Sequence, residues 1–223
     1  MIKRIKHIAL IALMMVLTAA MLSGCGPKKP APEEAQAYVK AVLDLMCTGD
    51  YDHTVDLADI EEGKEAETRD ALVDQMISEI GDKENLSDEV VSSFRDLMMA
   101  ALEKTKYTVG EAVETEDGGY DVTVTIEPLQ IFNGITKKID AVLEKKVAAE
   151  SDKILAMSEE EQTNYVMEIL IDLLNKKVEK PKYDPPEEVV VHYGIIEDKT
   201  GVYGCTEAEG EKLGKKLFSD SGL

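Results

Sequence analysis

Apolar residues recur every three or four positions along much of the chain, a spacing that is typical of helices with one buried face. In the first half this spacing predicts four helices, at 33–46, 51–60, 64–80 and 87–102. Ser87 is a favourable N-cap for the fourth of them, because its hydroxyl can accept a backbone N–H of the first turn. Gly49 and Gly81 are typical helix stops.

The period changes to two in the middle of the chain. Residues 107–114 and 120–127 are rich in Thr and Val, and apolar and polar residues alternate in both runs. The segment 116–119 between them, Glu-Asp-Gly-Gly, consists of turn-forming residues. This combination predicts a β-hairpin.

A helical pattern returns at 131–150, and a capping box formed by Ser158 and Glu161 opens the next helix. The density of β-branched residues in 188–196 predicts a central strand. A short last strand is expected at 202–205, after a turn at 198–201.

A second capping box, Thr206 with Glu209, predicts a last helix that runs to about Phe218. The order of elements defines an α+β protein with N-terminal helices, an antiparallel sheet and a helical-hairpin insertion at about 131–180. The alternative is two lobes, with the 131–180 helices as a separate unit.

The N-terminus has a different pattern. Three basic residues within 1–7 precede an apolar run at 8–21, which is the organisation of a secretory signal. A helix of this length spans only about 21 Å, which is too short for the ~30 Å hydrocarbon core. A membrane-spanning helix is therefore the less favoured interpretation.

The run ends in Leu22-Ser23-Gly24-Cys25, which resembles the lipobox of bacterial lipoproteins. The resemblance implies that signal peptidase II recognises Leu22, Ser23 and Gly24 and cleaves before Cys25. It also implies that Cys25 carries a diacylglyceryl group and that the protein is lipid-anchored on the extracytoplasmic face of the cell membrane. The alternative is an ordinary secreted protein in which Cys25 is free or disulfide-bonded.

This interpretation divides the chain into three parts. Residues 1–24 are a removed signal peptide, 25–32 are the lipidated cysteine with a Pro-rich spacer, and 33–223 are one folded domain. The spacer is expected to be extended and to hold the domain away from the bilayer.

The net charge of the chain bears on the class of partner. The chain has 25 Lys and Arg against 45 Asp and Glu, a net charge of −20. Removal of the signal peptide would remove three basic residues and make the balance more acidic. Such a domain is repelled by phosphate backbones, so the composition excludes nucleic acid as a partner.

Two cysteines remain once Cys25 is lipidated. An exported chain permits a Cys47–Cys205 disulfide, whereas the alternative is two separately buried thiols. The sequence contains no Cys/His spacing of a metal site and no phosphate-binding glycine loop, so no cofactor is expected. The acidic segment 50–62 does not match a calcium-loop template, and His192 is expected to be a structural histidine in a strand.

The segment 37–52, Ala-Tyr-Val-Lys-Ala-Val-Leu-Asp-Leu-Met-Cys-Thr-Gly-Asp-Tyr-Asp, is similar to the first helix and acidic turn of many Gram-positive lipoproteins of unknown function. The resemblance implies a cystatin-like or nuclear-transport-factor-like cone, in which a long helix packs on a curved antiparallel sheet. The 131–180 helices depart from the minimal cone. These families have no agreed active site, so no catalytic residue is carried over.

Three functions follow as hypotheses. The first is a non-catalytic binding or scaffold module held at the membrane by its lipid. The second is an enzyme or small-molecule binder with a pocket in the cone, lined by tyrosines such as Tyr38, Tyr107, Tyr120 and Tyr193. The third is an envelope sensor or regulatory lipoprotein that binds a peptide at a sheet edge.

Overall fold

The computed structural model describes residues 29–55, 57, 65–80, 86–197 and 202–219. Four strands form one open sheet in the order β1-β2-β3-β4, and all neighbours are antiparallel. The strands are β1 (Lys106–Glu114), β2 (Tyr120–Glu127), β3 (Glu187–Glu197) and β4 (Val202–Cys205). The α+β class and the antiparallel sheet packed with helices are therefore confirmed.

The central pairing joins β2 and β3, which are separated in sequence by the helical hairpin. Their register runs from Tyr120 opposite Tyr193 to Ile126 opposite Glu187. The predicted β-hairpin is present as β1 and β2, and Gly118 has φ +87° in the turn between them. That left-handed conformation favours glycine over residues with a Cβ.

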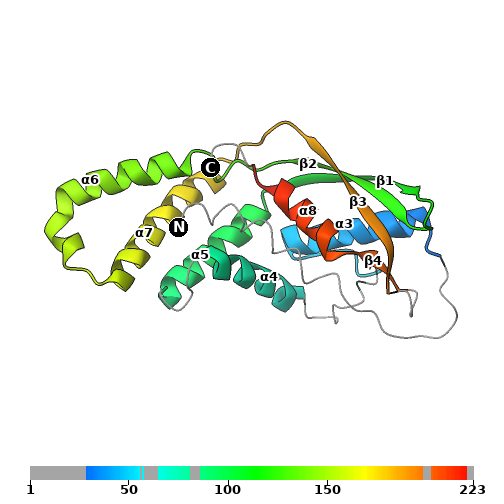
Figure 1. The fold of residues 1–223 in the computed structure, drawn as a ribbon, viewed down its shortest axis with the longest axis horizontal. Coiled ribbons are helices and arrows are strands. Elements are labelled where there is room, and N and C mark those ends of the chain that lie inside the picture. The colour runs from blue at the N-terminus through cyan, green and yellow to red at the C-terminus, as the bar shows by residue number, and fades with distance from the viewer. Residues whose placement is uncertain (1–28, 56, 58–64, 81–85, 198–201, 220–223) are drawn as a thin grey trace.

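Six helices complete the described fold. They are α3 (Pro32–Thr48), α4 (Glu65–Ile80), α5 (Asp88–Leu102), α6 (Ile135–Leu155), α7 (Glu159–Val178) and α8 (Glu207–Leu217). Figure 1 shows an elongated molecule with the sheet, α3 and α8 at one end and the α6–α7 hairpin at the other, while α4 and α5 lie between them. Helix α7 packs on α5 as well as on α6, so the hairpin is tied to the N-terminal helices.

The face of the sheet that meets α3 is filled by apolar side chains. Val122, Val124 and Ile126 of β2 are fully buried there. The rings of Tyr38 on α3 and Tyr193 on β3 lie 5.0 Å apart between centroids. These side chains belong to the hydrophobic core between α3 and the sheet.

Helix α8 covers an edge of the sheet that β4 leaves open. Strand β4 pairs with β3 only from Tyr193 onward. Beyond that point the carboxylate of Glu209 accepts the backbone N–H of His192 at 3.1 Å, and Lys212 donates to the carbonyl oxygen of Val190 at 2.6 Å. These contacts use backbone N–H and C=O groups of β3 that could otherwise pair with another strand. The predicted second capping box is wrong, because Thr206 makes no side-chain cap bond. The Glu209 carboxylate, which would have completed the box, binds the backbone of β3 instead.

The helix predicted at 51–60 is also wrong in its first half. Residues 51–55 form a turn, and the Asp52 carboxylate accepts hydrogen bonds from both the backbone N–H and the hydroxyl of Thr54. Such local side-chain bonds compete with helix formation. Residues 56 and 58–60 lie outside the described part of the chain.

Candidate functional site

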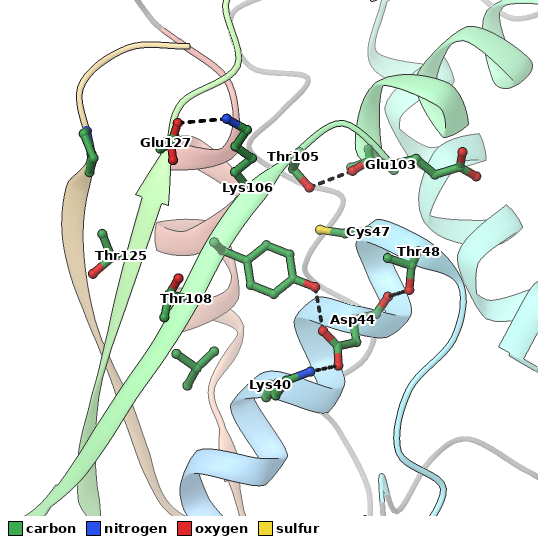
Figure 2. A pocket seen from close by; sticks show the side chains of 14 residues that line it. Lys40, Asp44, Cys47, Thr48, Glu103, Thr105, Lys106, Thr108, Thr125 and Glu127 are labelled. Carbon is green, nitrogen blue, oxygen red and sulfur yellow. Dashed lines mark hydrogen bonds and ion pairs between the residues drawn. The ribbon is translucent and has the colours of Figure 1, made fainter. Parts of the chain in front are cut away.

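A pocket of about 640 Å³ lies where the C-terminal half of α3 meets the first residues of β1, and we call it the edge pocket. Its lining comes from α3, the α5–β1 turn, β1, the end of β2 and the segment before β3 (Figure 2). The pocket is lined by residues from both faces of β1, such as Tyr107 and Thr108. This is geometrically possible because β1 is an edge strand, which leaves one side open.

Hydrogen bonds and ion pairs join polar residues that line the edge pocket. The Tyr107 hydroxyl donates to Asp44 Oδ1 at 2.7 Å, and Lys40 forms an ion pair with the other carboxylate oxygen of Asp44. Lys106 pairs with Glu127 at 3.2 Å on the opposite side (Figure 2). Charges of both signs therefore converge on one cavity, which suits a polar ligand.

Two groups in the edge pocket resist ionisation. Burial raises the pKa of the Cys47 thiol to about 11, so the group stays a neutral thiol at physiological pH. Burial, together with the hydrogen bond to Asp44, also raises the pKa of Tyr107. Neither residue is activated as a nucleophile or a base, and Tyr107 remains a hydrogen-bond donor.

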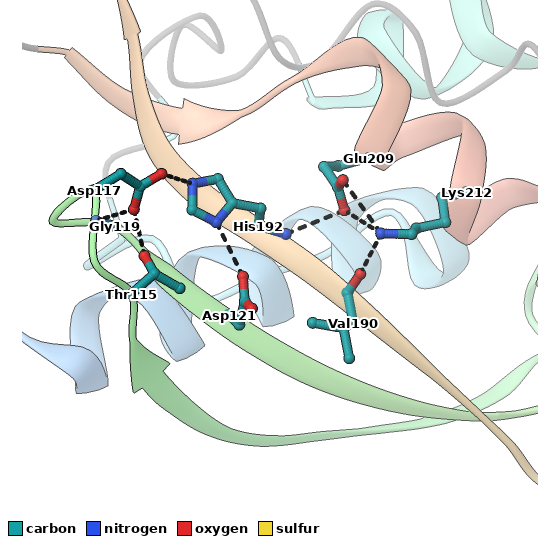
Figure 3. A network of polar contacts seen from close by, with 8 residues as sticks. All are labelled: Thr115, Asp117, Gly119, Asp121, Val190, His192, Glu209 and Lys212. Carbon is teal, nitrogen blue, oxygen red and sulfur yellow. Dashed lines mark hydrogen bonds and ion pairs between the residues drawn. The ribbon is translucent and has the colours of Figure 1, made fainter.

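A second polar cluster surrounds His192 on the face of the sheet that points away from α3. Its Nδ1 lies 3.0 Å from Asp121 Oδ1, and its Nε2 lies 3.2 Å from Asp117 Oδ2 (Figure 3). Asp117 also accepts bonds from the Thr115 hydroxyl and the Gly119 N–H. These bonds lower the pKa of Asp117, the Thr115 contact most of all. The cluster ties β3 to the β1–β2 turn, and His192 lies within a strand, as the sequence predicted.

The His192 ring also covers two glycines, which yields a test of its packing. A Cβ on Gly194 would lie 2.6 Å from His192 Nε2, and its three nearest neighbours would all be atoms of that ring. A Cβ on Gly119 would also lie 2.8 Å from the backbone oxygen of Tyr193. We expect Gly194→Ala to destabilise the protein by about 1–3 kcal/mol and most of that loss to disappear in a His192→Ala background. Gly119→Ala is the control and should remain costly in both backgrounds. Chemical denaturation of the wild type, the three single variants and the two double variants measures this coupling, and an unchanged Gly194→Ala cost in the His192→Ala background would contradict it.

The two cysteines left for a disulfide are separate. Cys47 and Cys205 are free, buried thiols. Cys205 lies opposite Tyr193 in the sheet, and the Tyr193 ring contacts the tilted ring of Tyr38. Tyr38 lies nine residues from Cys47 along α3. Nine helical residues extend about 13 Å. The cysteines thus lie near different parts of α3, and the alternative of two buried thiols matches the structure.

The predicted lipidation and cleavage residues, Leu22, Ser23, Gly24 and Cys25, lie outside the described residues. No helix in the described ranges has both the length and the apolar character needed to cross a bilayer. Within the same ranges no group of three or more potential ligands is placed to hold a metal ion. Residues 56 and 58–62 of the acidic segment 50–62 lie outside the described residues.

Among the four tyrosines proposed as cavity residues, only Tyr107 lines the edge pocket. Tyr38 and Tyr193 pack in the core, and the buried Tyr120 hydroxyl donates to the carbonyl oxygen of Pro30 at 2.7 Å. The sequence pattern did not identify Asp44 as a site residue, because its hydrogen-bond partner Tyr107 is 63 positions away. No local pattern relates two such residues.

The structure defines an α+β fold in which helices pack on an open four-stranded antiparallel sheet. A crystal structure of a candidate lipoprotein (ycdA) from Bacillus subtilis subsp. subtilis str. 168 is similar to it, with a TM-score of 0.58 and 11% sequence identity. The match covers 84% of this chain but 56% of that protein, so the chain spans little more than half of its length. No family model and no curated protein sequence matches the chain. At this identity the likeness shows the fold alone.

Proposed function

We propose that the protein is a lipid-anchored extracytoplasmic lipoprotein that acts as a non-catalytic binding module, with the edge pocket as its ligand site. The observation that carries the binding role is the convergence of Lys40, Asp44 and Tyr107 on one open cavity beside an edge strand. The lipobox resemblance at Leu22–Cys25 supports the anchor. The description of the Bacillus subtilis neighbour as a candidate lipoprotein is consistent with it.

The contacts of the N-terminal segment support this arrangement. Lys29 pairs with Glu114, and Pro30 accepts the Tyr120 hydroxyl, so the chain enters the domain at the β1–β2 turn. In our proposal residues 25–29 link this point to the lipid. Asp44 lies about 20 Å further along α3, at ~1.5 Å per residue from Pro30. The edge pocket then stands off from the point of anchoring.

Site-specific photo-cross-linking in intact cells tests the binding role. A photoreactive amino acid at Thr108, an exposed residue that lines the edge pocket, should give a discrete adduct in the anchored full-length protein. The same group at Lys145, exposed on α6, is the control and should give none. Adding Asp44→Asn should weaken the Thr108 adduct, because the substitution removes the charge that Lys40 and Tyr107 contact. Equal labelling at Thr108 and Lys145, or no labelling at either, would argue against the edge pocket as the site.

Peptide binding by strand addition is a second candidate for the ligand. The observation that favours it is the position of β1, because no described strand pairs with its outer side and the edge pocket lies along it. Strand β3, in contrast, is covered by α8 and β4. An extended peptide gains affinity from such an open edge. Mass analysis of the Thr108 adduct decides this point: a peptide mass supports strand addition, and a small-molecule mass contradicts it.

A further inference from the structure

A second cavity, of about 390 Å³, lies at the base of the α6–α7 hairpin, and we call it the lysine pocket. Five lysines line it: Lys138 on α6, Lys176 and Lys177 on α7, and Lys180 and Lys182 in the segment that leaves α7. No carboxylate is among its lining residues. This concentration of positive charge occurs in a protein whose net charge is −20, so average surface composition does not account for it.

The lysines of this cavity differ in their ion pairing from those of the sheet and α8. On the sheet and α8, Lys106, Lys212 and Lys216 all form ion pairs with carboxylates. None of the five pocket lysines pairs with a carboxylate of the described residues. The described residues thus supply no ion pair for these five charges, and a bound anion would supply one.

Lys177 is held in place by hydrogen bonds to the backbone. Its ammonium group donates to the carbonyl oxygens of Gln130, at 3.2 Å, and Asn133. Its pKa is lowered by burial and by repulsion from Lys138 and Lys182. Both carbonyls belong to the link between β2 and α6, so the fold itself positions the Lys177 charge at the pocket.

We propose that the lysine pocket binds a soluble, multiply charged phosphate group, such as the diphosphate or triphosphate part of a larger molecule. The volume exceeds that of one small anion, and several lysine charges match an anion that carries several charges. The pocket has lysines and no arginine among its lining residues. Lysine binds phosphate as a point charge, without the two parallel bonds that arginine forms to carboxylates and phosphates alike.

The position of the pocket favours a soluble ligand over the headgroup of an anionic lipid. Gln130 lies ten residues beyond Tyr120, whose hydroxyl holds Pro30 where the chain enters the domain. At ~3.3 Å per extended residue, these positions are separated by up to about 33 Å along the sheet. This step rests on the proposed lipid anchor, which would place the entry point close to the membrane and the lysine pocket far from it. Phosphate binding itself is independent of the anchor.

Calorimetric titration of the full-length chain, solubilised in a neutral detergent, with inorganic tripolyphosphate at low ionic strength tests the proposal. We expect saturable binding that the triple variant Lys138→Gln/Lys176→Gln/Lys182→Gln weakens by tenfold or more, because it removes three of the converging charges. The triple variant Lys153→Gln/Lys215→Gln/Lys216→Gln has the same net charge and is the matched control. It should change affinity by less than about twofold, since those lysines lie outside the pocket.

Each alternative outcome overturns the proposal. Equal losses in the two triple variants would mean that only overall charge matters. Equal affinity for citrate would contradict phosphate as the ligand class. If the chain binds vesicles that contain phosphatidylglycerol, loses that binding in the pocket variant and ignores tripolyphosphate, the ligand is a lipid headgroup. Because the titration measures phosphate alone, its failure is distinguishable from failure of the lipid-anchor proposal.

Discussion

Cys25→Ser should abolish incorporation of labelled palmitate and remove the mature protein from the membrane fraction. The physical reason is that the thiol of Cys25 is the proposed site of the diacylglyceryl group. A serine hydroxyl cannot replace it in the lipid-transfer reaction that the lipobox resemblance implies. Two acyl chains give stable anchoring because each buried CH₂ contributes about 0.8 kcal/mol. The serine variant should accumulate as uncut precursor or be released into the medium.

Cys47→Ser is the matched control for this experiment. It is the same chemical substitution, but Cys47 is a buried residue of α3 within the folded domain. The control should incorporate palmitate at the wild-type level per molecule, as measured by labelling of the immunopurified protein. Label that persists in Cys25→Ser would refute lipidation at Cys25, and label lost from both variants would point to an indirect effect on export.

Arg69→Met should destabilise the folded domain strongly, because one buried guanidinium serves the ends of two helices. Arg69 is 8% exposed, and its guanidinium donates to Met46 O at 3.2 Å, Cys47 O at 2.9 Å and Thr48 O at 3.4 Å. It also donates to Met99 O on α5 at 3.4 Å. The side chain thus satisfies carbonyls at the C-terminal ends of α3 and α5, where cations are favoured by the helix dipole.

We expect the free energy of unfolding of Arg69→Met to fall by about 3 kcal/mol, because buried carbonyls lose charged hydrogen-bond donors. For a domain of this size that loss lowers the melting temperature by roughly 6–12 °C. Arg95→Met is the control, because Arg95 pairs with Asp74 at a more exposed site and should cost about 1 kcal/mol or less. Thermal and chemical denaturation measure both. Equal effects of the two substitutions would show that the capping contacts of Arg69 contribute little.

Local patterns in the sequence were sufficient for most elements of the fold. Hydrophobic periodicity placed α3, α5 and α7, and the Ser87 cap and the Ser158–Glu161 capping box are both present. These predictions hold because a helix repeat and a cap depend on residues at most four positions apart. The predictions at 51–55 and at Thr206–Glu209 are wrong because other bonds involving Asp52 and Glu209 competed with the local pattern.

Local sequence patterns indicated far less about the candidate sites than about the helices and strands. Asp44 and Tyr107 meet only because α3 packs against β1, and their distance along the chain hides the contact. The lysine pocket had one local signal, the run of lysines at 176–182 in an acidic chain. Lys138 joins that run only through the hairpin formed by α6 and α7.

The sequence by itself determined the α+β order of elements, the acidity of the domain and the lipobox resemblance that motivates the membrane anchor, because each of these depends on composition or on neighbouring residues. The tertiary structure alone decided that the sheet interior is filled by the core, that Cys47 and Cys205 lie apart, and that polar groups gather at the β1 edge and at the base of the hairpin. Those outcomes depend on which distant segments pack together. Packing between distant segments is set by the burial of many side chains at once and not by any short stretch of sequence.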